Sequence, residues 1–367
     1  MIPHSRPTLD KDDIKEVVKV IQSGQIAQGE VVRKFEKKLS RFIGVKDAVA
    51  VSSGSAALHL SLLVLGIGKE DEVILPTYLC TAPLNAIRYV GADPVLCDIN
   101  LMDFNIDVEE VKDKINKKTK AIIVPHIFGT PCQIDELQGF GIPIIEDCAH
   151  SIGAKYKGRR VGSFGKVSIF SFYATKMLTT GEGGMILSNS QKILNKIRDL
   201  RDYDEKKDYK VRYNYKLSDI QAGLGCSQLS KIPTFISKRK KIASVYNKEF
   251  ERCDFELPFI LIDGRHKCRP YIDGGLDKSS PYKGRESVFY RYVIRIKGNV
   301  TKGLNELRRR GIICKRPIFK PLHRYLKIDG FKNSEKVYNS AISIPIYPSL
   351  KDEEIKKIVA AVKKVFL

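Results

Sequence analysis

A single lysine, Lys176, stands between two short apolar stretches of the chain. Residues 167–172 are apolar, β-branched and aromatic, and residues 185–187 begin a similar run. Such runs, bounded by turn residues, predict buried strands. Burial disfavours the ammonium form of a lysine, lowers its pKa and leaves a nucleophilic amine suited to Schiff-base chemistry. The alternative is a solvated lysine at the end of a strand, which is common in proteins.

A carboxylate follows another apolar strand. Residues 142–145 lead directly into Glu146 and Asp147, and the carboxyl end of a parallel strand is where α/β sheets bind ligands. Pyridoxal phosphate needs a lysine to hold its aldehyde and an aspartate to keep its pyridine nitrogen protonated. We therefore predict Lys176 and Asp147 as catalytic residues and pyridoxal phosphate as the cofactor.

A third feature predicts an anion site. Residues 48–51 form a predicted strand, Ser52-Ser53-Gly54-Ser55 form a turn, and residues 56–65 form a predicted helix. Free backbone N–H groups and the helix dipole favour a phosphate at such a turn. The alternative is a serine that caps the helix without any ligand.

These features resemble the motifs of a known family. Residues 145–186, IEDCAHSIGAKYKGRRVGSFGKVSIFSFYATKMLTTGEGGMI, and residues 213–225, YNYKLSDIQAGLG, are similar to the core of the DegT/DnrJ/EryC1/StrS sugar aminotransferases. The resemblance extends over essentially the whole chain. It implies a fold-type I, pyridoxal-phosphate-dependent transferase of the α/β class, with a three-layer αβα large domain around a mostly parallel sheet. A smaller α+β C-terminal domain would follow, with residues 1–235 in the first domain and 236–367 in the second.

The resemblance also implies roles for further residues. Gly54, Ser55 and Ser171 would hold the cofactor phosphate, and His150 would contact the hydroxyl group of the ring. Asn214 would reach the phosphate bound by the neighbouring subunit, which implies a homodimer with two shared active sites. Serine at 55 replaces the threonine that is commoner in the family, and it keeps the hydroxyl group.

Two positions remain open by this reasoning. The family places an aromatic residue against the cofactor ring, but Cys80 occupies that position and Tyr78 lies two residues earlier. Either residue can cover the ring. On the substrate side, His323 lies in a Pro-Leu-His motif that the family shares, and His126 follows a strand end. We predict that both histidines line the substrate pocket, with a loop-filling role as the alternative for His126.

The implied reaction is a transamination in two halves, through an internal aldimine of Lys176. An amino acid, glutamate by resemblance, would give its amino group to the cofactor, which would pass it to a keto sugar carried on a nucleotide. Relatives that dehydrate sugars have histidine in place of this lysine, so Lys176 argues against dehydration. Two alternatives are an aminotransferase for a keto-inositol and, from another class, a non-catalytic regulatory or nucleic-acid-binding protein.

The composition bounds these alternatives. The chain has 367 residues, a formal net charge of +22, and 43% hydrophobic residues. Its basic residues are mostly scattered lysines without an arginine-rich arm, which favours a solvated surface over nucleic-acid binding. None of the eight cysteines forms a CxxC pair or a metal-type cluster, so we predict no metal, no disulfide framework and a reducing compartment. Without an apolar span or signal peptide, the prediction is a cytoplasmic protein with no membrane partner.

Outside the motifs, periodicity predicts several elements. Residues 10–23 form an amphipathic helix, for which the inward face is predicted to be Ile14, Val17, Val18 and Ile21. A long helix over 231–251 leads into the C-terminal domain, and residues 288–296 alternate as a strand. Residues 263–286 are rich in glycine, proline and charge, and are a candidate substrate flap.

Overall fold

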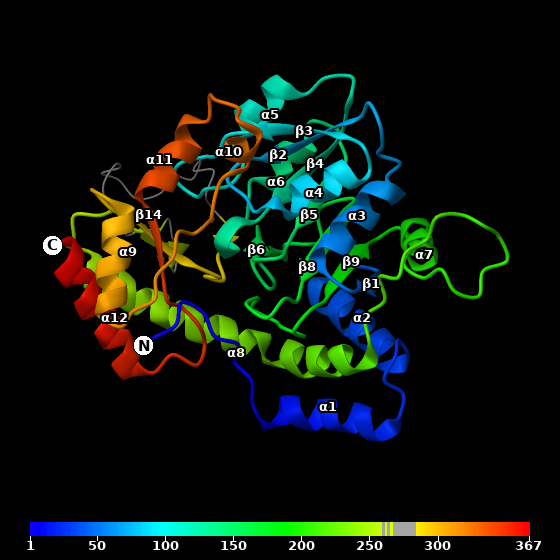
Figure 1. Ribbon diagram of the computed structural model, residues 1–367, viewed down its shortest axis with the longest axis horizontal. Coiled ribbons are helices and arrows are strands. Elements are labelled where there is room, and N and C mark those ends of the chain that lie inside the picture. The colour runs from blue at the N-terminus through cyan, green and yellow to red at the C-terminus, as the bar shows by residue number, and fades with distance from the viewer. Residues whose placement is uncertain (259–260, 263–264, 267–283) are drawn as a thin grey trace.

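A seven-stranded sheet forms the centre of the computed structural model, in the order β1-β9-β8-β5-β4-β2-β3 (Figure 1). All neighbouring pairs from β8 to β3 are parallel, while β9 runs antiparallel to both β8 and β1. The structure describes residues 1–258, 261–262, 265–266 and 284–367, so most of the predicted flap at 263–286 lies outside the described residues. The strands are β1 Asp47–Val51, β2 Glu72–Pro76, β3 Asp93–Cys97, β4 Thr119–Pro125, β5 Ile144–Asp147, β8 Val167–Ser171 and β9 Gly184–Ser188.

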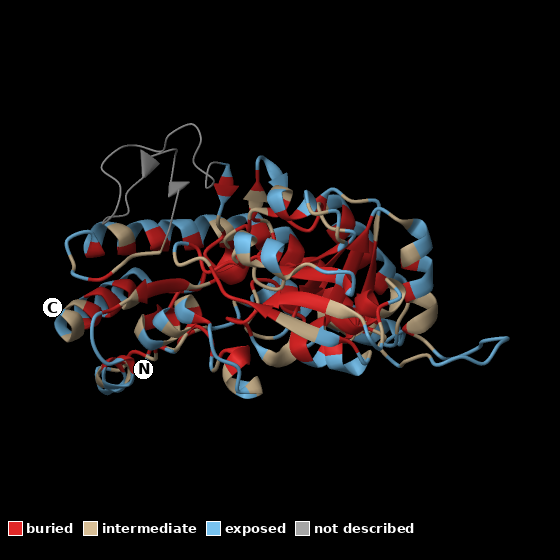
Figure 2. Ribbon diagram, turned by 90° about the horizontal axis from the view of Figure 1, so that it is seen from above, coloured by how far each residue is buried: buried red, intermediate tan, exposed pale blue. Residues whose placement is uncertain are grey.

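Helices cover both faces of this sheet. Alternate residues of β1 show the two layers: Ala48 and Ala50 pack in one core cluster and Val49 and Val51 in another, as the two-residue period of a strand requires. The strands are almost entirely buried between the layers (Figure 2). The predicted αβα architecture with a mostly parallel sheet is thus confirmed. The first cluster includes α2 (Glu30–Ile43), α5 (Val108–Lys114) and α6 (Ile134–Gln138), and the second includes α3 (Gly54–Val64), α4 (Thr81–Tyr89) and α7 (Gln191–Leu200).

One long helix, α8 (Asp219–Phe250), joins the two parts of the molecule. It begins well before the predicted start at residue 231, because Ser218 and Gln221 form a capping box there. Its first half packs in the core of the sheet and its second half in the C-terminal core. The predicted boundary between residues 235 and 236 therefore falls inside α8, and the division into two domains stays a prediction.

The C-terminal part is a small α+β layer. Strands β13 (Tyr292–Arg295) and β14 (Ala341–Ile344) pair antiparallel, and Figure 1 shows α9 and α12 beside β14. Strand β13 is shorter than predicted, because the N–H groups of Val288 and Arg291 bond instead to the carbonyls of Gly129 and Phe128. The helices are α9 (Val300–Arg309), α10 (Leu322–Leu326), α11 (Lys332–Ser340) and α12 (Asp352–Phe366).

Short elements complete the described chain. A 3₁₀ turn, η1 (Ile127–Gly129), follows β4. Three short strands form a second sheet, and two further short strands pair antiparallel. They are β6 (Lys155–Tyr156), β7 (Arg159–Arg160) and β12 (Arg285–Glu286), then β10 (Leu261–Ile262) and β11 (Arg265–His266).

The N-terminal helix α1 (Lys11–Ser23) packs along α8 (Figure 1), but the predicted inward face is wrong. Ile14 is 63% exposed and Ile21 is 54% exposed, and Val18 is exposed as well, whereas Val20 is buried against α8. Hydrophobic periodicity locates an apolar stripe, but it does not tell which side of the helix its own chain covers. The apolar stripe of Ile14, Val18 and Ile21 is exposed on this chain.

Across the described residues, no helix combines the length and the apolar character needed to cross a bilayer.

Candidate active site

The residues predicted to do chemistry gather at the carboxyl edge of the sheet. Asp147 is the last residue of β5, Ser171 is the last residue of β8, and the turn that ends at Gly54 follows β1. Parallel strands present their carboxyl ends at one edge, which is where open α/β sheets bind ligands. The topology thus brings Gly54 next to Ser171, which lies 117 residues later in the chain.

Lys176 lies in the turn between β8 and β9. Its backbone N–H bonds to the carbonyl of Tyr173 at 2.8 Å, and the side chain is half-buried. Its ammonium nitrogen lies 5.4 Å from the centroid of the Tyr290 ring. Burial raises the pKa of Asp147 and lowers that of His150; the charge of Lys176 opposes the first shift and adds to the second. Lys176 therefore lies near enough to Asp147 and His150 for its charge to act on both.

Asp147 is buried and has one free oxygen. Its Oδ1 accepts a hydrogen bond from the Ala149 N–H at 3.0 Å, while no described residue donates to Oδ2. Burial raises the pKa of this carboxyl above its ordinary value, against the lowering effects of the Ala149 bond and of the Lys176 charge. A cationic N–H donor at Oδ2 would restore the ionised form. A protonated pyridine nitrogen is such a donor.

His150 lies in a stack of aromatic rings. Its ring is 4.3 Å from the Tyr290 ring at an angle of 19°, and 6.1 Å from the Phe128 ring at 16°. Burial, followed by the charges of Lys176 and Arg291, lowers the pKa of His150 well below its usual value. His150 is therefore neutral at physiological pH and able to act as a hydrogen-bond donor or acceptor next to Lys176.

At the predicted phosphate site the backbone of Gly54 and Gly184 packs closely against its neighbours. A Cβ atom on Gly54 would lie 2.9 Å from the Cβ atom of Ser171, and one on Gly184 would lie 2.3 Å from the carbonyl oxygen of Ser53. Only glycine fits at both positions. Gly54 opens α3, so its N–H and that of Ser55 have no acceptor within the helix. The turn, Ser171 and the start of α3 thus form one polar cradle, and Ser55 on its rim is exposed.

Asn214 is also exposed, between two stacked tyrosines. The rings of Tyr213 and Tyr215 are 5.0 Å apart at 11°, and the carbonyl of Tyr215 accepts from the N–H of Ser52 at 2.8 Å. This bond fixes the Asn214 segment beside the turn that precedes Gly54. The predicted contact between Asn214 and a neighbouring subunit stays a prediction, because a single chain cannot display it.

The two candidates for covering the cofactor ring lie in different places. Tyr78 is 1% exposed and packs edge-on against Phe128 at 6.4 Å, in the core. Cys80 has exposed surface; burial of its thiol raises the pKa, opposed by the charge of Lys176 and reinforced by that of Asp147. Of these two side chains, Cys80 is the one placed close enough to sense both catalytic residues.

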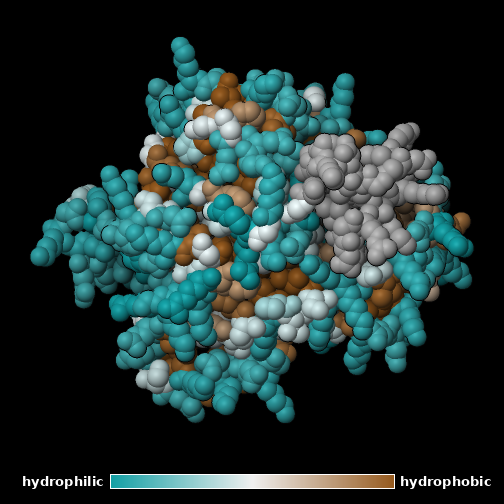
Figure 3. Space-filling view, turned by 180° about the vertical axis from the view of Figure 1, so that it is seen from behind, coloured by the Kyte–Doolittle hydropathy of each residue, from teal (hydrophilic) through white to brown (hydrophobic). Residues whose placement is uncertain are grey.

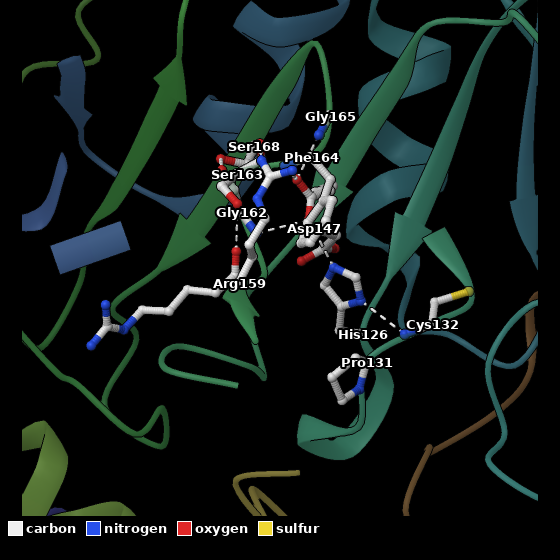
Figure 4. Close-up of polar contacts among 12 residues, drawn as sticks. His126, Pro131, Cys132, Asp147, Arg159, Gly162, Ser163, Phe164, Gly165 and Ser168 are labelled. Carbon is white, nitrogen blue, oxygen red and sulfur yellow. Dashed lines mark hydrogen bonds and ion pairs between the residues drawn. The ribbon is translucent and has the colours of Figure 1, made fainter. Parts of the chain in front are cut away.

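His126 does not reach the substrate side, which corrects the prediction. The side chain is fully buried. Its Nδ1 accepts from the N–H of Cys132 at 3.0 Å, drawn as a dashed line in Figure 4. Its Nε2 lies 3.0 Å from Glu146 Oε1. Both ring nitrogens are therefore used within the fold, and neither is left for a substrate.

His323 is corrected for the same reason. It is 4% exposed. Its Nδ1 lies 2.8 Å from the Thr77 hydroxyl and its Nε2 lies 2.7 Å from Glu335, and its ring stacks on Phe331. The Pro-Leu-His motif thus anchors α10 to the chain after β2.

Glu146, next to Asp147, also has a structural role. Glu146 accepts hydrogen bonds at 2.7 Å from the N–H groups of Gly162, Phe164 and Gly165, all three of which are labelled in Figure 4. Burial would raise its pKa, but these bonds and the one to His126 outweigh burial and lower it. His126, Glu146 and Cys148 have metal-type ligand atoms within 4.8 Å of one another. The histidine and glutamate atoms, however, already carry these hydrogen bonds.

Sequence reasoning missed Tyr290. This residue is 7% exposed, stacks on His150 and lies over Lys176. Burial alone would raise the pKa of its hydroxyl, but the charges of Lys176 and Arg291, a hydrogen bond with Thr175 and the charge of Arg239 outweigh burial and lower it. Nothing in the local sequence relates residue 290 to residue 176, since only the bonds of residues 288–291 to the turn after β4 bring them together.

The site fits pyridoxal phosphate. Four kinds of group lie at the carboxyl edge of the sheet: a glycine-dependent turn, a buried carboxylate with a free oxygen, a neutral histidine and a half-buried lysine. These are the groups that would bind, respectively, the phosphate, the pyridine nitrogen, the ring and the aldehyde of the cofactor.

The comparisons with known proteins agree with this geometry. The chain is 33% identical to the GDP-perosamine synthase of Vibrio cholerae, with 100% of this chain and 99% of that protein covered. The aminotransferase TlmJ of Streptoalloteichus hindustanus has a TM-score of 0.90 at 26% identity, with 100% and 98% covered. A putative sugar aminotransferase of Streptococcus pneumoniae, solved in its PMP form, has a TM-score of 0.88 at 27% identity, with 100% and 99% covered.

A family model matches residues 7–363, which leaves few residues at either end outside the match. The chain therefore belongs to the DegT/DnrJ/EryC1/StrS aminotransferase family, a family of sugar aminotransferases.

Proposed function

We propose that this enzyme transfers an amino group from an amino acid to a keto sugar linked to a nucleotide, with pyridoxal phosphate bound through Lys176. The observation that carries this proposal is the position of Lys176 over the Tyr290 ring that stacks on His150, at the same sheet edge as the buried carboxylate of Asp147 and the glycine-dependent turn at Gly54. When bound, pyridoxal phosphate supplies an electron sink for the bond changes at the donor Cα.

Lys176 has two tasks in this proposal. It holds the cofactor covalently between turnovers, and its freed amine takes the proton from the donor Cα as a general base. The position of the amine over the Tyr290 ring, 5.4 Å from the centroid, keeps it near the reacting atoms.

Asp147 and His150 hold the ring in place. Asp147 would accept from the pyridine N–H through Oδ2, while Ala149 keeps Oδ1 in position. His150, neutral and stacked on Tyr290, would bond the ring hydroxyl. Of the ring-covering candidates, the placement of Cys80 supports it over Tyr78.

The proposed enzyme is a homodimer in which each active site is completed by the second chain. Ser55 and Asn214 are polar, exposed and close to the phosphate cradle, as expected of residues at a site completed by a second chain. The exposed stripe of Ile14, Val18 and Ile21 on α1 and the apolar surface near the middle of the rear face (Figure 3) are further surface that a partner can cover.

The acceptor class rests on the relatives. GDP-perosamine synthase acts in the chemistry of a nucleotide-linked amino sugar, as its name states, and this chain matches it over its full length. The net charge of +22 would favour the approach of such an anionic substrate.

The test is an assay of amino transfer from glutamate to a panel of nucleotide-linked keto sugars, with a keto-inositol included. We expect turnover with at least one nucleotide-linked sugar and its loss in Lys176→Ala. Turnover with the keto-inositol alone would contradict the proposed acceptor, and turnover that survives Lys176→Ala would contradict the proposed mechanism.

A further inference from the structure

The loop between α7 and α8 stands out from the molecule beside β1, the edge strand on which α7 packs (Figure 1). Its residues Tyr213, Asn214 and Tyr215 are anchored to the end of α7. The N–H of Tyr213 donates to the carbonyl of Leu200 at 2.8 Å, and the N–H of Tyr215 donates to that of Arg201 at 2.9 Å. Asn214 thus lies on a segment that is fixed on both sides of it.

The side chains of this segment fall on two sides of the backbone. The rings of Tyr213 and Tyr215 stack at 5.0 Å and 11°, so both leave the backbone on the same side. Asn214, between them, is exposed, whereas both tyrosines are partly buried. This alternation is that of an extended chain, and it leaves the Asn214 amide on the exposed side.

His59, in the second turn of α3, packs against both rings. It is 5% exposed, and its ring meets that of Tyr213 edge-on at 4.9 Å and that of Tyr215 at 6.0 Å. Its Nδ1 lies 3.2 Å from the Tyr215 hydroxyl. Burial lowers the pKa of His59 below its ordinary value, so the ring is neutral at pH 7 and Nδ1 can accept a hydrogen bond from that hydroxyl.

A third tyrosine completes the cluster. The Tyr89 ring, at the end of α4, lies edge-on to His59 at 5.6 Å and is 63% exposed. The ring contacts of His59 are thus with three tyrosines, and its hydrogen bond is with one of them, Tyr215. These contacts lead to the Asn214 segment and not to Lys176.

We propose that His59 is a positioning residue for Asn214 and, through it, for the active site of the second subunit. This inference rests on the proposed function with its shared sites, and it adds a residue that acts on the other chain without touching the cofactor. A hydrogen bond from the Asn214 amide to a phosphate oxygen requires the two atoms to lie about 3 Å apart. An anchored segment meets this requirement without ordering a loop at each binding event.

His59 can also act within its own chain. It lies on the helix whose first residues, Gly54 and Ser55, form the predicted phosphate cradle. A loss of cofactor affinity on changing His59 can therefore arise in one chain, through α3, or across the dimer, through Asn214. The two tests below separate these routes.

The first test titrates the cofactor-free protein with pyridoxal phosphate. His59→Phe keeps a ring but removes the bond to Tyr215, and Tyr215→Phe removes the same bond while His59 stays in place. Each change should weaken cofactor affinity by about three- to tenfold, the range for one hydrogen bond. In Asn214→Ala, which has no amide to position, adding His59→Phe should weaken binding no further. Ser61→Ala, which removes a buried hydrogen bond to the Ala57 carbonyl in the same helix, should leave the affinity unchanged.

The second test finds the chain in which the effect arises. His59→Phe and Lys176→Ala are unfolded and refolded together in equal amounts, so that half of the Lys176 side chains lie in mixed dimers. In a mixed dimer, the site with Lys176 receives Asn214 from the chain whose His59 is intact. The cofactor fixed to Lys176 by borohydride is then measured over a range of cofactor concentrations. We expect two equal populations, one with wild-type affinity and one with the weaker affinity of His59→Phe.

Three results would overturn the inference. They are wild-type affinity in both His59→Phe and Tyr215→Phe, a further loss when His59→Phe is added to Asn214→Ala, and a single weak population in the mixture, which would place the effect within one chain. A mixture of Asn214→Ala with Lys176→Ala is the control for the shared site. If the control gives two populations and the His59→Phe mixture gives one, only the inference fails. If the control also gives one, the shared-site part of the proposed function fails and the inference fails with it.

Discussion

Glu146 and Asp147 are adjacent carboxylates with opposite surroundings. Three backbone N–H groups and His126 surround Glu146 and lower its pKa, whereas Asp147 has one N–H donor and burial raises its pKa. Because neighbouring residues of a strand face opposite sides, one carboxylate can hold the fold while the next is kept for a ligand. The Oδ2 of Asp147, to which no described residue donates, therefore marks the side of the strand that faces a ligand.

A pH-dependent prediction follows for Asp147 in the cofactor-free protein. A carboxyl whose folded pKa is raised contributes stability below its unfolded pKa, about 3.9, and loses it as pH rises through the folded pKa. Asp147→Asn removes this loss, so it should make the cofactor-free protein more stable than wild type at neutral pH and not at pH 3. Denaturant unfolding at the two pH values measures this difference. The same variant should lose most amino transfer, and a less stable variant at neutral pH would contradict the account.

The phosphate cradle gives a second prediction at this scale. Gly54→Ala forces a Cβ atom to within 2.9 Å of Ser171, a strain of about 1–3 kcal/mol. Titration with pyridoxal phosphate should therefore show weaker binding. Gly68→Ala is the matched control, since its Cβ atom would meet nothing closer than 3.8 Å. Equal cofactor affinity of the two variants would remove Gly54 from the site.

At the scale of elements, Asp219 ties two helices together. It opens α8, is 2% exposed, and accepts from the N–H groups of Gly29, Val31 and Val32 at the start of α2 at 2.8, 3.2 and 2.9 Å. Gly29 has no side chain with which to cap α2, so Asp219 supplies the cap from another helix. The start of α8 and the start of α2 are thereby fixed relative to each other.

Asp219→Ala should therefore lower the free energy of unfolding by about 2–4 kcal/mol, since it leaves several backbone N–H groups without acceptors. Chemical denaturation measures the change. Asp352→Ala, which removes an exposed aspartate from the first turn of α12, should cost less than 1 kcal/mol. Similar costs for the two variants would mean that the cap contributes little.

Some elements and residues could be predicted from the sequence and others could not. Asp147 and the Gly54 turn were found because each directly follows an apolar strand, a local signal. His126 and His323 were misassigned, because residue type does not show that both ring nitrogens are used inside the fold. Tyr290 carries no local signal, since its role depends on contacts with distant residues.

At the scale of the whole molecule, the proposed shared sites predict complementation between two inactive variants. Lys176→Ala lacks the reacting amine, and Asn214→Ala lacks the group proposed to reach the neighbouring subunit. A mixed dimer would contain one site with both changes and one site with neither. An equal mixture, unfolded and refolded together, should recover about a quarter of wild-type activity. Activity no greater than the sum of the separate variants would place Asn214 in the site of its own chain.

The covalent link between Lys176 and the cofactor is the central claim, and one measurement tests it directly. The purified enzyme is loaded with pyridoxal phosphate, reduced with borohydride to fix any imine, digested, and mapped by mass spectrometry. The account predicts one phosphopyridoxyl group per chain, on the peptide that contains Lys176, and none in Lys176→Ala. Labelling of a different lysine, or no fixed cofactor on the loaded wild-type enzyme, would contradict it.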